Sequence, residues 1–262
     1  MISSVKIQFK ELIGKKSVII TYFILMGFMI VNFIINMIGY SDVKYVSEMY
    51  DPIKMMTLST WSKTGYFLRI IYPILVCIPA SAVYRTNKES ISINYMRSKA
   101  VAIFLVTFLV FTIPFILEFV LSCICFNINS LGDPTNVVYT DMEGMESRYF
   151  LSELWLNNRI AYAIVMIVLF GTLSGILAVF NFSICTLPIF KFKILTFLPI
   201  FVMFQLINLI DKVVKFRIET NYSVLISMFD KSDKLDGVYL IFMMALLIVS
   251  FMIIRNKRVE AL

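Results

Sequence analysis

The residues that could carry chemistry in this chain are few, and the commonest catalytic one is missing. The 262-residue sequence has no histidine, which most often serves as general base or metal ligand near neutral pH. Its four cysteines (Cys77, Cys123, Cys125 and Cys185) lie in or at the ends of apolar runs, which is typical of packing rather than of metal binding. We therefore expect no catalytic constellation, no metal site and no cofactor bound by this chain itself.

Two ionisable residues fall inside otherwise apolar stretches, namely Arg69 and Glu118. A charge at the centre of a membrane span costs about 2.5–3.5 kcal/mol on insertion scales, so such residues usually face a partner or a cavity. One hypothesis is that the two side chains pair, or line one polar vestibule. The alternative is that Arg69 extends outward to the membrane surface, while Glu118 packs in its protonated form.

The remaining notable charges form a short basic turn between two apolar runs. Residues 84–100 read YRTNKESISINYMRSKA and contain Arg85, Lys88, Arg97 and Lys99 against a single acid, Glu89. The chain offers no complete phosphate-binding loop of its own. Its nearest match, residues 14–17, lacks the required first glycine and follows no strand.

The composition indicates that these groups are set in a membrane protein. Hydrophobic residues make up 60% of the chain, charged residues 16%, and mean hydropathy is +0.86, whereas soluble domains are about 45–50% apolar. A bilayer core of about 30 Å needs roughly 20 apolar helical residues. We predict an all-α polytopic membrane protein with six transmembrane helices at residues 17–38, 65–84, 100–126, 160–185, 192–210 and 237–254.

The distribution of Lys and Arg sets the predicted orientation. An even number of spans places both termini on one side, and that side has 13 basic residues against 10 on the other. Basic residues accumulate in cytoplasmic loops, so both termini are predicted to be cytoplasmic. The net charge of +7 then reflects membrane topology, and we expect no nucleic-acid partner.

Two further patterns concern packing. Residues 1–16 are predicted to form an interfacial amphipathic helix ahead of the transmembrane domain, 17–262; a plain cytoplasmic extension of the first span is the alternative. Its apolar face would consist of Ile2, Val5, Phe9, Leu12 and Ile13. In the fourth span, Gly171 and Gly175 are four residues apart, which lets a second helix approach closely. That helix could belong to the same chain or to another protomer.

This arrangement resembles the ABC-2-type permeases, the membrane subunits of bacterial ABC exporters. Glu89 stands where that family commonly has an acid after the second span, and Arg97 and Lys99 stand near the basic residues that enter the third. The usual Gly-Thr after the acid is replaced by Ser90-Ile91. The 150–158 segment (FLSELWLNN), with Tyr162, Gly171, Gly175 and Pro199, is similar to firmicute permeases of the peptide-antibiotic export or immunity type.

The resemblance implies a function and a set of partners. Two permease copies, or two homologous permeases, would form the pore, and two ABC ATPase subunits carrying ATP and Mg²⁺ would bind their cytoplasmic face in the bacterial plasma membrane. Carried over from the family, the residues that meet the ATPase would be Arg85, Lys88, Glu89, Tyr95 and Arg97. The substrate would be hydrophobic or a peptide. The alternative is an ATP-independent membrane protein, either a secondary transporter or an immunity or scaffold protein.

Overall fold

The computed structural model describes residues 2–42, 53–81, 93–125, 150–187, 193–214, 223–230 and 236–256. Within these ranges the chain is helical and contains no strand beyond an isolated bridge between Ser59 and Met228. The prediction of an all-α protein is therefore confirmed.

Five helical stretches in the described residues are long and apolar enough to cross a bilayer, so the chain is a multi-pass membrane protein. Four of them are continuous helices, and the fifth is the pair α4 and α5. Their bounds are α2 (Lys16–Asp42), α4 (Lys63–Leu75) with α5 (Cys77–Ser81), α6 (Ile93–Cys125), α9 (Arg159–Cys185) and α12 (Asp236–Asn256).

The stretch predicted as the fifth of six spans is built differently. A short 3-10 helix, η1 (Lys193–Phe197), precedes α10 (Pro199–Val214). Proline has no N–H to donate and is favoured in the first turn of a helix, so α10 begins at Pro199 rather than near residue 192. With 16 residues, α10 is about 24 Å long, which is short of a bilayer core of about 30 Å.

The second span is interrupted towards its end. Val76 separates α4 from α5. Pro73 removes one hydrogen bond within α4, whereas Pro79 lies in the first turn of α5, where proline is tolerated. Asn181, fully buried on α9, bonds the segment just after the break. Its Nδ2 donates to the carbonyl oxygen of Cys77 at 3.5 Å and to that of Thr196 at 3.0 Å. One amide thus ties α5 and η1 to the central helix.

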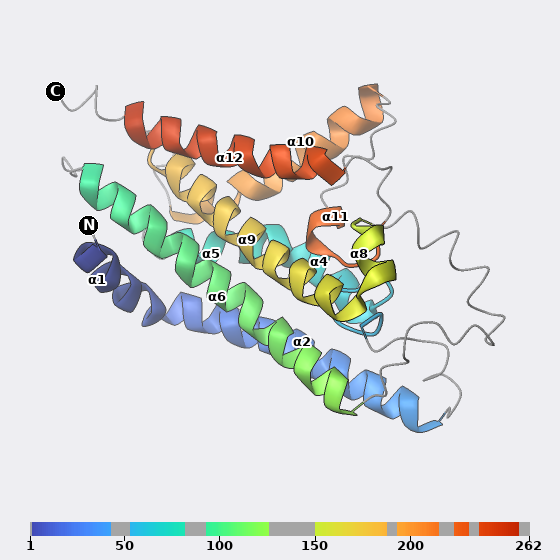
Figure 1. Cartoon of the computed structure of the whole chain (residues 1–262). Helices are drawn as coiled ribbons and strands as arrows, with labels where there is room; N and C mark the ends of the chain where they lie inside the picture. The colour runs from blue at the N-terminus through green and yellow to red at the C-terminus, as the bar shows by residue number, and fades with distance from the viewer. Residues whose placement is uncertain are drawn as a thin grey trace.

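The helices form an elongated bundle with two distinguishable ends (Figure 1). We call the first the terminal end, because α1 (Ile2–Ile13), the start of α6 and the last turn of α12 lie there. The opposite, distal end carries α8 (Ser152–Asn157) and α11 (Ser223–Ile226). The first and last described helices therefore meet the same end of the bundle.

The centre of the bundle is the contact between α6 and α9. Gly171 and Gly175 face α6 so closely that a Cβ at Gly171 would overlap Thr112 Oγ1, and one at Gly175 would come within 2.7 Å of the Phe104 ring. Beside them the Tyr72 hydroxyl and Ser174 Oγ are hydrogen-bonded at 3.0 Å. The structure thus places the two glycines at a contact within the chain, the first of the two alternatives.

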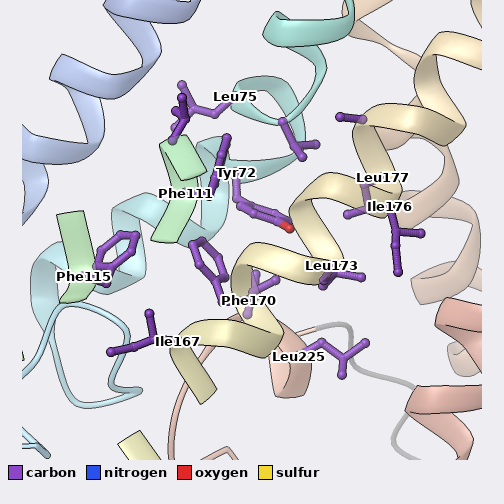
Figure 2. Close-up of a cluster of buried hydrophobic side chains, with 14 of the residues drawn as sticks. Tyr72, Leu75, Phe111, Phe115, Ile167, Phe170, Leu173, Ile176, Leu177 and Leu225 are labelled. Carbon is purple, nitrogen blue, oxygen red and sulfur yellow. The ribbon is translucent and has the colours of Figure 1, made fainter. Parts of the chain in front are cut away.

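The aromatic core follows from this close approach. Rings from α4, α6 and α9 meet at edge-on or tilted angles, which suits the quadrupoles of aromatic rings. Figure 2 shows them converging beside the α9 backbone. The core rings are Tyr72, Phe111, Phe115 and Phe170.

Candidate functional site

Polar side chains gather at both ends of the bundle. At the terminal end, α1 packs against the first turns of α6, where Ser4 Oγ and Ser98 Oγ lie 3.0 Å apart. The face of α1 that is buried contains Gln8 and Leu12, whereas Ile13 is 45% exposed. Leu12 of the predicted apolar face therefore packs inside the bundle, and the placement of that face against lipid stays a prediction.

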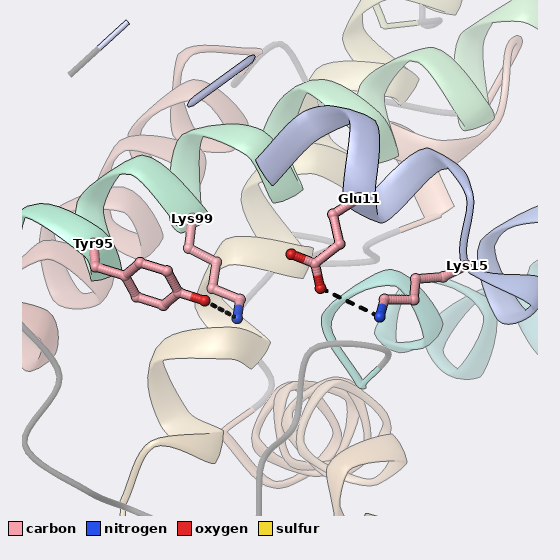
Figure 3. A network of polar contacts seen from close by, with 4 residues as sticks. All are labelled: Glu11, Lys15, Tyr95 and Lys99. Atoms are coloured by element: carbon pink, nitrogen blue, oxygen red, sulfur yellow. Dashed lines mark hydrogen bonds and ion pairs between the residues drawn. The ribbon is translucent and has the colours of Figure 1, made fainter. Parts of the chain in front are cut away.

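The residue that follows Ser98 on α6 is a buried cation. Lys99 is only 6% exposed, and its Nζ donates to the Tyr95 hydroxyl at 3.1 Å. Nearby, Glu11 Oε1 of α1 forms an ion pair at 3.2 Å with Nζ of Lys15, which lies between α1 and α2. Figure 3 shows all four side chains directed to the same side of the two helices.

The predicted ATPase-contact residues are only partly described. Arg85, Lys88 and Glu89 lie outside the described residues. Tyr95 faces Lys99, whereas Arg97 is exposed on the other side of α6, with its guanidinium 5.6 Å from the ring centre of Phe251 on α12. The arginine therefore links the start of α6 to the end of α12.

At the distal end, Glu118 is the centre of a buried polar network. Its side chain is 1% exposed, and Oε1 accepts three hydrogen bonds of 2.8 Å. The donors are Asn32 Nδ2 on α2 and both the backbone N–H and the hydroxyl of Thr57. Oε2 has no hydrogen-bond partner. One carboxylate oxygen thus joins α2, α6 and the segment 53–62.

Asn32 is the second centre of this network. Its Oδ1 accepts from the hydroxyls of Ser62 at 2.8 Å and Thr64 at 2.7 Å, while Nδ2 also donates to the carbonyl of Met55 at 2.8 Å. Ser62 Oγ in turn caps α4 by accepting from the backbone N–H of Gly65. A side chain at Gly65 would overlap the Thr57 carbonyl oxygen, so glycine is required for this approach.

Arg69 and Glu118 do not form the ion pair considered above; both residues are described, and each has other partners. Arg69 Nη2 donates to the carbonyl of Thr60 at 3.4 Å, and Glu118 bonds Thr57 and Asn32. The two side chains nevertheless bond the same segment, because their partners Thr60 and Thr57 are three residues apart. Asn32 and Thr57 were missed in the sequence, although an asparagine in the first apolar run was a usable signal.

The distal end is closed by an aromatic cluster. Trp155 of α8 packs edge-on to Phe229 at 4.7 Å and to Tyr162 at 5.4 Å between ring centres. Two buried cations lie over its indole, Lys54 Nζ at 5.5 Å and the Arg159 guanidinium at 4.8 Å. Such contacts strengthen when desolvated.

Backbone hydrogen bonds connect this cluster to the segment 53–62. Met228 N–H donates to the carbonyl of Leu58 at 2.7 Å, and Thr60 N–H donates to the carbonyl of Met228 at 3.0 Å. The segment that bonds Glu118 on one side therefore holds α11 and α8 on the other. Among the described residues, no group of three or more Cys, Asp or Glu side chains is arranged to hold a metal ion.

Comparison with known proteins adds no relative: no family model, no curated protein and no solved structure matches this chain. The assignment of function therefore rests on the chain's own residues and geometry.

Proposed function

We propose that this chain is the permease subunit of an ABC transporter in a bacterial plasma membrane. In this proposal it crosses the membrane six times, with both termini in the cytoplasm and the terminal end of the bundle facing the ATPase. It exports a hydrophobic or peptide substrate, such as an antimicrobial peptide. ATP and Mg²⁺ are bound by two copies of a separate ATPase, and a second permease completes the pore.

The observation that carries this proposal is the packing of α1 onto the start of α6. Through Ser4, Ser98 and the buried Leu12, an N-terminal helix and the helix that follows the basic turn form one surface. This surface carries the exposed cations Lys10 and Arg97. A surface that carries these cations suits a partner with acidic side chains.

Helix α6 connects this surface to the distal end of the bundle. α6 has 33 residues, equivalent to about 50 Å, and it carries Arg97 near its start and Glu118 near its end. A packed helix moves largely as a rigid element, so a displacement at the ATPase surface would reach the distal network. In the proposal, ATP binding closes the ATPase pair, and this closure moves α1 and α6 together. The movement of α6 then shifts segment 53–62.

Co-purification tests the proposal directly. We expect a tagged chain, extracted in mild detergent from its native host, to bring down a protein with a phosphate-binding loop. The complex should hydrolyse ATP, and a catalytically dead ATPase variant should abolish that activity. A purified chain that transports or protects cells without any ATPase partner would contradict the proposal.

Arg97→Glu should weaken binding of the ATPase without changing the stability of the chain. Reversing the charge of this exposed residue removes a contact with Phe251 worth about 0.5–1 kcal/mol at exposed sites, so the melting temperature should change little. Binding of the ATPase should weaken about tenfold or more, because a like-charge contact replaces an attractive one. Arg255→Glu, an exposed arginine on the last turn of α12, is the matched control. Equal effects of the two variants would place the contact surface elsewhere.

One observation favours a second candidate, an ATP-independent transporter. A buried ionisable residue within a span marks a functional site by default, and Glu118 on α6 is such a residue. Ion-coupled transport by the purified chain in vesicles, with no ATPase present, would select this candidate over the first.

A further inference from the structure

The ammonium of Lys99 is buried at the terminal end with a neutral partner. Its side chain is 6% exposed, and the Tyr95 hydroxyl accepts from Nζ at 3.1 Å, with the Tyr95 ring centre 4.9 Å away. An ammonium has three N–H donors, and the hydroxyl takes one. Burying a charge is costly unless it is paired, so this position calls for an anion.

The described part of the chain does not supply that anion. Glu11 lies in the same view as Lys99 (Figure 3), yet its carboxylate pairs with Lys15 at 3.2 Å. No carboxylate of a described residue forms an ion pair with Lys99. The cation on the other side of the helix, Arg97, is directed to Phe251 instead.

The position of Lys99 in the bundle indicates the chemistry of the missing anion. Lys99 is six residues into α6, a helix that crosses the membrane, and it lies beside α1, which carries exposed Lys6 and Lys10; exposed Lys16 begins α2. At the end of a membrane span the abundant anion is the phosphodiester of a lipid headgroup, and basic pockets between membrane helices bind such headgroups. Lysine contacts phosphate as a point charge.

We propose that Lys99, assisted by the Tyr95 hydroxyl, binds the phosphodiester of an anionic phospholipid where α1 meets α6. The lipid supplies the counter-charge that the described residues do not, and it anchors α1 to the start of α6. This site does not depend on the identity of any ATPase partner.

The test measures the unfolding midpoint of the purified full chain in detergent as lipid is added. Phosphatidylglycerol should raise the midpoint saturably, whereas zwitterionic phosphatidylcholine should not. In Lys99→Met the half-saturating concentration should rise roughly ten- to a hundredfold, as expected for loss of one charge-assisted hydrogen bond. Lys99→Arg should retain the response, because it keeps the charge.

Control variants separate a specific site from general electrostatics. Lys63→Met removes an exposed lysine at the start of α4 and should leave the lipid response unchanged. Without lipid, Lys99→Met should be at least as stable as the wild type, because an apolar side chain replaces an uncompensated buried charge; Lys99→Gln serves if the methionine variant does not fold. The proposal is overturned if Lys99→Met and wild type respond equally, if phosphatidylcholine acts as well, or if inorganic phosphate alone reproduces the effect.

Discussion

Replacing Glu118 with leucine should destabilise the chain by about 2–4 kcal/mol, since leaving one buried donor without an acceptor costs about 1–3 kcal/mol. Three donors lose their acceptor: Asn32 Nδ2 and the N–H and hydroxyl of Thr57. The Thr57 hydroxyl can rotate to another acceptor, so the total loss of stability is smaller than three times the cost of one unsatisfied donor. The measurement is the thermal unfolding midpoint in detergent. Limited proteolysis of segment 53–62 should accelerate in parallel.

Glu118→Gln is the matched control. The glutamine amide keeps an acceptor oxygen where Oε1 receives its three hydrogen bonds, and its NH₂ takes the place of Oε2, which has no hydrogen-bond partner. We expect this variant to retain most of the stability and the protection of segment 53–62. If Gln and Leu destabilise equally, the three hydrogen bonds do not hold the segment. If neither has an effect, the network contributes nothing to stability.

Helix type and approximate span positions could be predicted because they depend on local properties. A run of about 20 apolar residues matches the bilayer thickness wherever it occurs in the sequence, and α2, α9 and α12 follow the predicted ranges closely. The third span was predicted to start at residue 100, whereas α6 already begins at Ile93, within the predicted basic turn. The predicted span that begins at residue 192 is apolar enough, but its helix starts later than predicted, because Pro199 sets the start of α10. The backbone constraint of proline, not hydropathy, decides where that helix begins.

The partners of the ionisable residues could not be predicted in the same way. Glu118 is 86 residues from Asn32 and 61 from Thr57, so no periodicity within one helix brings them together. Pairing Glu118 with Arg69 was reasonable from charge alone. The chain instead satisfies the carboxylate with neutral donors, because segment 53–62 folds against α2 and α6. That fold depends on Gly65, whose role is visible only once the Thr57 carbonyl is placed beside it.

Substitutions at the two glycines of α9 should have the second large effect. At Gly175, an alanine Cβ would approach the Phe104 ring to 2.7 Å and the Phe104 carbonyl oxygen to 3.1 Å. Because part of that contact is backbone, α6 must shift, and overpacking of this kind costs about 1–3 kcal/mol. The control is Gly27→Ala on α2, where a Cβ meets nothing within 4 Å. That change should be neutral or stabilise by up to about 1 kcal/mol through helix propensity.

Gly171 allows a sharper version of the experiment, because its contact is with a side chain. A Cβ there would overlap Thr112 Oγ1, a buried hydroxyl with no hydrogen-bond partner. Gly171→Ala should therefore destabilise, and adding Thr112→Ala should restore much of the loss, giving a coupling energy of about 0.5–3 kcal/mol in a double-mutant cycle. Additive effects would show that the two residues do not touch. If the glycines instead packed between protomers, Gly171→Ala would change the dimer fraction and leave the monomer's unfolding midpoint unchanged, so measuring both separates a contact within the chain from one between chains.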